Sequence, residues 1–283
     1  MRNTPAVEEI NTLFSPGTAR YLEDGSIVKL PFVGVFDAHS AAYNDEHPPI
    51  LFNKLTGGEA VARAIFNAFN SSGPDVPLRE VVLRANHTIA MIQEQKGISI
   101  NLTSELAGAT FVFAKIGERE VEVIQGGDCF ALWLTSSGNL GITPSQNYRW
   151  EKILRDKIAK LMRQCRGDRK RMWKRFYPFL CGQRQKHNNK DFAILNGQPG
   201  VEGKWNEFKI PVSELQLLIC FTDGLVPFSL TKRSENLAQI VIEQYGLGGL
   251  QEMLNWTRMA ERDLAAESHE DFGEATALAV SFK

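Results

Sequence analysis

Carboxylate side chains stand at the ends of apolar, β-rich segments at four places in this 283-residue sequence. They are Asp37 after residues 31–36, Asp128 after 122–127, Asp223 after 217–222, and the pair Asp271 and Glu274 just before 275–282. A single aspartate at a strand end can simply cap the backbone N–H groups of a turn. The recurrence favours a second interpretation, in which these carboxylates converge on one metal centre. Oxygen ligands without a neighbouring cysteine or histidine pair are typical of Mg²⁺ or Mn²⁺ rather than Zn²⁺.

A histidine accompanies the first of these carboxylates. His39 follows Asp37 with only Ala38 between them. Taken alone, such a histidine is best explained as a hydrogen-bonded turn residue. Beside a metal-binding aspartate, an imidazole can donate a proton to a leaving group near neutral pH. We therefore expect His39 to be a candidate general acid.

The order of short motifs along the chain resembles that of the metal-dependent serine/threonine phosphatases of the protein phosphatase 2C type. The matching segments are, in order, residues 20–24 (RYLED), 37–40 (DAHS), 108–110 (GAT), 127–129 (GDC), 193–197 (AILNG), 222–224 (TDG) and 273–276 (GEAT). Each motif is short, but their shared order covers nearly the whole chain. The resemblance implies hydrolysis of phosphoserine and phosphothreonine monoesters, with a phosphorylated protein as the substrate partner.

The resemblance also implies roles for single residues around two metal ions, Mg²⁺ or Mn²⁺, with a third ion as an accessory. It implies Asp37 as the bridging ligand, Asp223 with Glu274 or Asp271 at one ion, Glu23 and the Ala38 carbonyl at the other, and Asp128 at the accessory ion. Arg20 would hold the phosphate through its fork of N–H donors. A metal pair can share a water molecule, lower its pKa and hold it in line with phosphorus.

Several positions depart from the family pattern. Ala38 replaces a glycine, and Glu23 lies one residue closer to Arg20 than the pattern expects. The aspartate of the last motif falls on Gly273, so that Glu274 or Asp271 would have to replace it. These departures leave open an alternative from another class, a pseudophosphatase that binds phosphoproteins but has lost full metal binding.

The pattern of apolar residues predicts a mixed chain. We expect strands at 31–36, 110–116, 119–125, 129–135, 216–221 and 275–282, and helices at 57–70, 77–95, 150–165, 234–245 and 248–266. Gly117-Glu118 between two of the strands is typical of a hairpin. Strands and helices do not alternate regularly, which argues against a doubly wound parallel sheet. The elements suit an α+β fold, the four-layer α-β-β-α sandwich of two antiparallel sheets that the resemblance implies.

Composition is that of a globular chain with one domain over residues 1–283. Hydrophobic residues make up 43% of the sequence, enough for a sizeable core. No uncharged apolar run is long enough for a membrane span, and the N-terminus has no apolar signal segment. Four cysteines without CxxC spacing indicate reduced thiols, so we expect a cytoplasmic protein without a membrane partner.

Residues 149–190 break the charge balance of the chain. This segment has 15 lysines and arginines and 3 acidic residues, a net charge of +12, whereas the whole chain carries −1. The resemblance places it as an enlarged helical flap beside the active site. It could attract acidic phosphorylated substrates to an anionic cleft, or it could be a solvated helical face anchored by its aromatic residues. Nucleic-acid binding is not favoured, because no recognised binding fold accompanies the charge.

Overall fold

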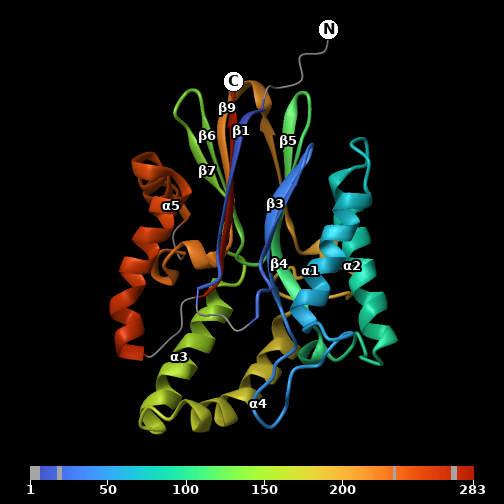
Figure 1. Ribbon diagram of the computed structural model, residues 1–283, viewed down its shortest axis with the longest axis vertical. Coiled ribbons are helices and arrows are strands. Elements are labelled where there is room, and N and C mark those ends of the chain that lie inside the picture. The colour runs from blue at the N-terminus through green and yellow to red at the C-terminus, as the bar shows by residue number, and fades with distance from the viewer. Residues whose placement is uncertain (1–6, 18–20, 232–233, 269–272) are drawn as a thin grey trace.

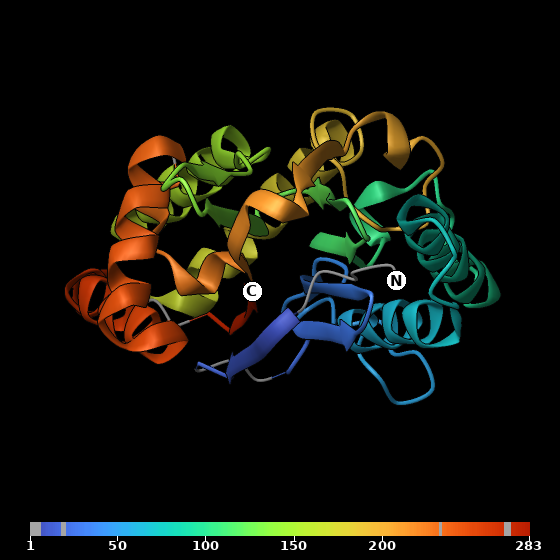
Figure 2. The ribbon, with the colours of Figure 1, turned by 90° about the horizontal axis from the view of Figure 1, so that it is seen from above.

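Two five-stranded antiparallel sheets form the centre of the molecule. The computed structural model describes residues 7–17, 21–231, 234–268 and 273–283. One sheet has the order β2 (Gly25–Lys29), β3 (Phe32–His39), β4 (Gly108–Ile116), β5 (Glu120–Gly126) and β8 (Asn206–Pro211). The other has the order β1 (Val7–Ser15), β10 (Ala275–Phe282), β9 (Leu215–Phe221), β6 (Phe130–Thr135) and β7 (Leu140–Ile142). The sheets pack face to face (Figures 1 and 2).

Strand β3 shows why the central strands read as continuous apolar runs. Phe32 and Phe36 point to the helices outside the sheet, whereas Val33 and Val35 point to the opposite sheet. All four side chains are fully buried. Because successive residues of a strand face opposite sides, a strand in an inner layer must be apolar at every position.

Helices cover the outer face of each sheet and complete four layers. Helices α1 (Gly57–Ser71) and α2 (Leu78–Gln95) pack on the sheet that contains β3, and α5 (Ser234–Ser268) packs on the other sheet. Helix α1 begins with a capping box, in which Thr56 accepts from the Glu59 N–H and the Glu59 carboxylate accepts from the Thr56 N–H. The α+β four-layer sandwich predicted from the sequence is therefore confirmed.

A hairpin of two further helices lies across one end of the sandwich, which we call the α3–α4 hairpin. It consists of α3 (Tyr148–Gln164) and α4 (Arg169–His187), at the lower end in Figure 1. The two helices share a small core around Leu154, Leu161 and Phe176. Two ion pairs join α4 to the 41–56 loop, from Lys170 to Asp45 (3.2 Å) and from Lys174 to Glu46 (2.6 Å), and the rings of His47 and Tyr177 stack.

The predicted elements are present with small shifts at their ends, but the prediction was incomplete. It missed strands β1, β2, β7 and β8 and did not give α4 separate bounds. β2, β1, β7 and β8 all lie at sheet edges, where one-sided burial weakens the apolar pattern. Helix α5 has non-helical backbone at Gly248 and Gly249, immediately after the break that the sequence predicted at residues 246–247. Among the described residues, no helix has the length and apolar character that crossing a membrane requires.

Candidate active site

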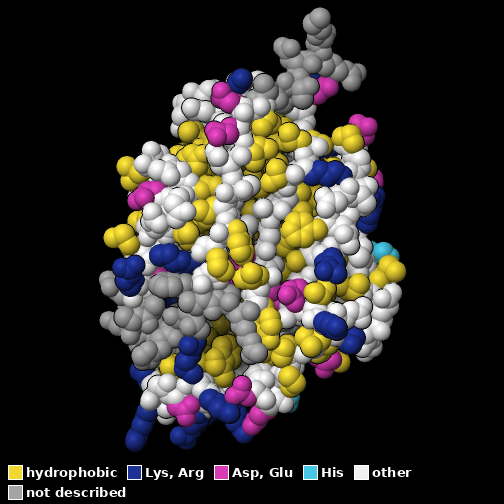
Figure 3. Space-filling model, in the orientation of Figure 1, with side chains coloured by type: hydrophobic (Ala, Val, Ile, Leu, Met, Phe, Trp, Pro, Cys, Tyr) yellow, Lys and Arg dark blue, Asp and Glu magenta, His cyan; other side chains and the backbone are white. Residues whose placement is uncertain are grey.

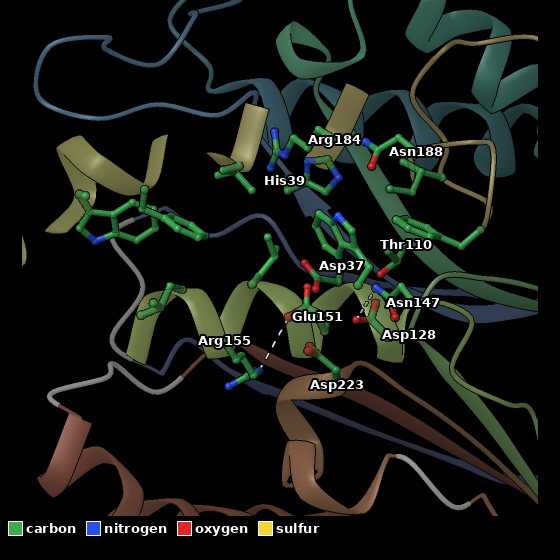
Figure 4. Close-up of a pocket in the computed structure, with 18 of the residues that line it drawn as sticks. Asp37, His39, Thr110, Asp128, Asn147, Glu151, Arg155, Arg184, Asn188 and Asp223 are labelled. Carbon is green, nitrogen blue, oxygen red and sulfur yellow. Dashed lines mark hydrogen bonds and ion pairs between the residues drawn. The ribbon is translucent and has the colours of Figure 1, made fainter. Parts of the chain in front are cut away.

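Three of the four strand ends singled out in the sequence meet at a cavity of about 450 Å³ under the α3–α4 hairpin. Asp37 reaches it from β3, Asp128 from the turn after β5, and Asp223 from the turn after β9. Figure 4 shows these carboxylates on one side of the cavity, with His39 and Arg184 on the opposite side. Antiparallel pairing places Thr110 directly across from Asp37. The sandwich thus brings together three of the predicted metal ligands and the predicted general acid.

The carboxylates disfavour one another's ionised forms. Burial raises the pKa of Asp37 well above its usual range, and the neighbouring charges of Asp24, Asp223 and Asp128 raise it further. Burial likewise raises the pKa of Asp223, with further contributions from Asp128 and Glu151. Like charges held close in a partly dry site cannot all ionise freely. The site therefore favours a bound cation or a retained proton.

Asp24 is the N-terminal carboxylate of this cluster. Burial, followed by the charge of Glu274, raises its pKa to about 7. Its carboxyl group lies within hydrogen-bonding reach of Asp37 and accepts a hydrogen bond from Thr222 Oγ1 at 3.0 Å. Thr222 in turn accepts from the Thr276 N–H at 3.0 Å, at the start of β10. Residues from three distant parts of the chain therefore fix the position of one carboxylate.

Asp128 is held by the first residues that lead into α3. Asn147 donates from Nδ2 to Asp128 Oδ2 at 2.8 Å, and both side chains are buried. Burial raises the pKa of Asp128, whereas the hydrogen bonds from Asn147 and Thr110 oppose that rise. The α3–α4 hairpin therefore helps to orient a carboxylate that the sequence placed at an accessory metal.

Gly224 allows the turn that carries Asp223 to reach the cluster. A Cβ atom added at this position would lie 1.7 Å from the backbone oxygen of Glu274. No real side chain tolerates that approach, so glycine is required here for close backbone contact rather than for an unusual φ. The Asp-Gly pair of the sequence motif is explained by this contact.

In this structure the Glu23 carboxylate accepts hydrogen bonds from neighbouring hydroxyl groups, and the Glu274 carboxylate accepts them from a backbone N–H. Glu23 accepts hydrogen bonds from Ser40 Oγ at 2.7 Å and from Thr56 Oγ1. Glu274 accepts from the Glu23 N–H at 3.0 and 3.2 Å through its two carboxylate oxygens. Burial raises the pKa of Glu274. Of the adjacent pair Glu23 and Asp24, it is Asp24 that lies beside Asp37.

His39 and Arg184 lie together on the other side of the cavity, where Arg184 carries the positive charge. Arg184, from α4, donates from Nη1 to the Ser40 carbonyl oxygen at 3.0 Å. Burial, followed by the charge of Arg184, lowers the pKa of His39 to about 3. His39 Nδ1 lies 3.3 Å from the Ser40 carbonyl, which can only accept, so Nδ1 carries the proton of the neutral ring. The imidazole is neutral at pH 7 and presents Nε2 as an acceptor.

Helix α3 adds a carboxylate and an arginine one turn apart. Glu151 Oε2 lies 3.8 Å from Arg155 Nε, and both residues line the cavity. Burial and the charge of Asp128 raise the pKa of Glu151 to about 7, against the opposing effects of Arg155 and Arg184. In the sequence, such a Glu–Arg spacing indicates only a surface pair on a helix.

The sequence reasoning missed Asp24, Glu151 and Arg184 as site residues. Only Asp24 had a usable signal, because it belongs to the 20–24 motif. Of the other predicted residues, Ala38 is buried in β3 opposite Ala109. Arg20 and Asp271 lie outside the described residues.

Comparison with protein-family models gives no match, and comparison with curated protein sequences gives none either. Solved structures do match over nearly the full length. The Mycobacterium tuberculosis serine/threonine phosphatase PstP/Ppp is 12% identical with a TM-score of 0.59, over 98% of this chain and 100% of that one. The Staphylococcus aureus serine/threonine phosphatase Stp1 is 14% identical with a TM-score of 0.56, over 100% and 98%. The chain has the fold of the PPM serine/threonine phosphatases.

A third structure with this PPM fold is the catalytic domain of the serine/threonine phosphatase PstP in complex with two manganese ions. It is 13% identical, with a TM-score of 0.57, and each chain is covered over 97% of its length. The fold agrees with the resemblance that the motifs indicated. At these identities the likeness establishes the architecture, and the chemistry has to be argued from the side chains.

The donor chemistry of the carboxylate cluster fits a hard divalent cation. Asp24, Asp37, Asp128 and Asp223 offer only oxygen atoms, and burial raises the pKa of each of them, because water does not compensate a buried negative charge. In the part of the chain that the structure describes, no three His, Cys, Asp or Glu side chains are already arranged to hold one ion. If the protein binds Mg²⁺ or Mn²⁺ at this cluster, these four aspartates are the residues that would hold it.

Proposed function

We propose that this protein is a metal-dependent phosphatase that hydrolyses phosphoserine and phosphothreonine monoesters. The observation that carries the proposal is the meeting of Asp24, Asp37 and Asp223 at one end of the sandwich, opposite Arg184 and His39. Carboxylates that repel one another favour a bound Mg²⁺ or Mn²⁺, and the positive charge of Arg184 suits a phosphate dianion. When bound there, the ions would supply a water molecule of lowered pKa as the nucleophile.

Arg184 is the residue of the described chain that we assign to phosphate binding. Its hydrogen bond to the Ser40 carbonyl fixes the guanidinium beside His39 and leaves further N–H donors in the fork. A planar fork matches phosphate oxygens in pairs, as a lysine ammonium cannot. In this proposal, Arg184 of the α3–α4 hairpin binds the phosphate, which is the role that the resemblance implies for Arg20.

His39 would donate the proton that the leaving alkoxide needs. In the free protein, burial and Arg184 keep the imidazole neutral. A phosphate dianion placed between His39 and Arg184 reverses the local charge, which favours protonation of the ring. Substrate binding would thus charge His39 at the moment when a proton donor is required.

The α3–α4 hairpin would attract the acidic substrate by its positive charge. Figure 3 shows lysine and arginine side chains projecting from the lower edge of the molecule, where this hairpin lies. The hairpin thus sets positive charge around an anionic site, an arrangement that steers an acidic phosphoprotein by long-range attraction.

The test is hydrolysis of p-nitrophenyl phosphate and a phosphothreonine peptide with Mn²⁺, and again with excess chelator. We expect wild-type turnover that the chelator abolishes, and a loss of at least about a hundredfold in kcat for Asp37→Asn, which retains shape but not charge. Arg184→Lys should chiefly raise KM, by about tenfold, because a point charge replaces the fork. Metal-independent turnover, or unchanged kinetics in folded Asp37→Asn, would refute the proposal.

A second candidate function has one specific observation in its favour. The Glu274 carboxylate is engaged with the backbone N–H of Glu23, and Gly273 occupies the position where the family pattern has an aspartate. A protein with this arrangement could bind phosphoproteins without hydrolysing them. Phosphopeptide binding without turnover in Mn²⁺, lost in Arg184→Gln, would support this pseudophosphatase.

A further inference from the structure

One face of α3 lines the cavity and changes in character along the helix. Its residues are three or four apart, which keeps them on one side: Glu151, Arg155, Ile158 and Met162. Glu151 and Arg155 lie near the carboxylates (Figure 4), whereas Ile158 and Met162 are apolar. From Glu151 to Met162 the helix advances by about 16 Å. On this side, the cavity is therefore charged beside the carboxylates and apolar towards the end of α3.

The facing side of α4 has the same two parts in the reverse order along the chain. It contributes residues four apart, which are Met172, Phe176, Leu180 and Arg184. Because the hairpin reverses the chain direction, the charged ends of the two faces meet, and the charges of Arg184 and Glu151 interact. The apolar ends meet near the 165–168 loop. We call this apolar end the hairpin trough, lined by Ile158, Met162, Met172, Trp173 and Phe176.

The hairpin trough is open to solvent. Met172 and Phe176 are buried and form its floor, whereas Ile158 and Met162 are partly exposed and Trp173 is 36% exposed. Trp173 packs edge to face on Phe176, with the ring centroids 5.4 Å apart, so that the indole is held in place. Contiguous apolar surface rimmed by charged residues is typical of a binding site. The hairpin trough therefore offers such a surface beside the carboxylate cluster.

We propose that the hairpin trough binds a large apolar side chain of the phosphopeptide substrate, about two to five residues from the phosphorylated residue. The inference rests on the proposed function in one respect, that Arg184 and the carboxylate cluster hold the phosphate. An extended peptide advances by about 3.3 Å per residue, so about five residues span the 16 Å or so from the charged end to Met162. A leucine side chain placed there would lose its contact with water, which strengthens binding.

The shape and charge of the hairpin trough favour a peptide over the chain of a lipid phosphate. A long aliphatic chain needs a closed tunnel to leave water, whereas Ile158, Met162 and Trp173 border an open surface. At the start of α4, Arg169 also lines the cavity and adds positive charge at the far end. An acidic peptide with one apolar side chain therefore matches both the apolar surface and the charge around it.

The probes are fluorescent peptides in which a phosphonate that cannot be hydrolysed replaces the phosphothreonine phosphate. Binding to the full chain is measured by fluorescence anisotropy in Mn²⁺, so turnover plays no part. A single leucine is moved along an otherwise acidic and polar peptide, on either side of the phosphonate, with asparagine as the reference. Leucine at about two to five residues should tighten binding by at least about tenfold. Leucine about ten residues away, which is beyond the trough, should change Kd by less than about twofold.

Variants of the trough give an independent check. Met162→Gln combined with Trp173→Gln should reduce the leucine effect to less than about threefold, while the asparagine peptide binds within about twofold of wild type. Ile153→Gln is the matched control that should keep the full effect, since Ile153 is 43% exposed and does not line the cavity. If the double variant fails to fold in a thermal melt, Met162→Gln alone decides, and the leucine effect should fall by at least about threefold.

Three results would overturn the proposal. They are no binding of any leucine peptide up to about 1 mM, a leucine effect that ignores position or survives in the trough variants, and tighter binding of dodecyl phosphonate than of the best leucine peptide. Turnover of p-nitrophenyl phosphate tests the proposed function separately. A protein with this turnover but no leucine effect keeps the function and loses the trough, and a protein with the leucine effect but no turnover does the reverse.

Discussion

Replacing Asp24 with asparagine should stabilise the metal-free protein. The carboxyl group of Asp24 is partly buried, lies next to Asp37, and has a pKa raised to about 7 from 3.8. Because the folded chain holds this proton more tightly than the unfolded chain, the stabilising contribution is present below pH 3.8 and is lost as the pH rises through 7. Asparagine has nearly the same shape and can still accept the hydrogen bond from Thr222, but it never ionises.

The size of the effect follows from the two pKa values. The raised pKa lowers the free energy of unfolding by about 4 kcal/mol at pH 8, where Asp24 is ionised in both states, and by about 2 kcal/mol at pH 5, where only the unfolded chain has released the proton. For a chain of this length, 1 kcal/mol shifts Tm by about 2 °C. Asp24→Asn should therefore raise Tm by about 8 °C at pH 8 and by about half as much at pH 5.

The assay is a set of thermal melts, followed by far-ultraviolet circular dichroism, in excess chelator between pH 5 and pH 8. Asp75→Asn is a matched control, because Asp75 is an exposed acid outside the cluster. Adding Mn²⁺ should raise the Tm of the wild type above that of Asp24→Asn, since the ion stabilises the protein that keeps all of its carboxylate ligands. An Asp24→Asn protein that melts at or below the wild-type temperature at pH 8, or whose gain does not change with pH, would refute the reasoning.

Two further predictions concern the turn at Asp223 and the hairpin. Gly224→Ala should cost more than about 3 kcal/mol, because its Cβ would lie 1.7 Å from a backbone oxygen. Gly182→Ala in α4 has open space and should be neutral or slightly stabilising in the same melts, so equal effects of the two would contradict the contact argument. Replacing the exposed Lys160, Arg163 and Arg171 with glutamine should raise KM for an acidic phosphopeptide and flatten its salt dependence. A loss of kcat at unchanged KM would instead place these side chains in the chemistry.

The sequence by itself determined the central layers and the kind of site. Apolar runs without alternation required strands buried on both faces, and Gly117 with Glu118 required a hairpin, which forms between β4 and β5. Aspartates at the ends of such strands had to reach an edge of the sandwich. These inferences succeeded because each depends on a few adjacent residues.

Only the tertiary structure decided which neighbours complete the site. The choice between Glu23 and Asp24 depends on Thr222 and Thr276, which are distant in sequence and approach only when β9 pairs with β10. Arg184 enters the site because α4 folds back across the sandwich end. A basic amphipathic helix has many equivalent charges in sequence, and packing alone selects the one that turns inward.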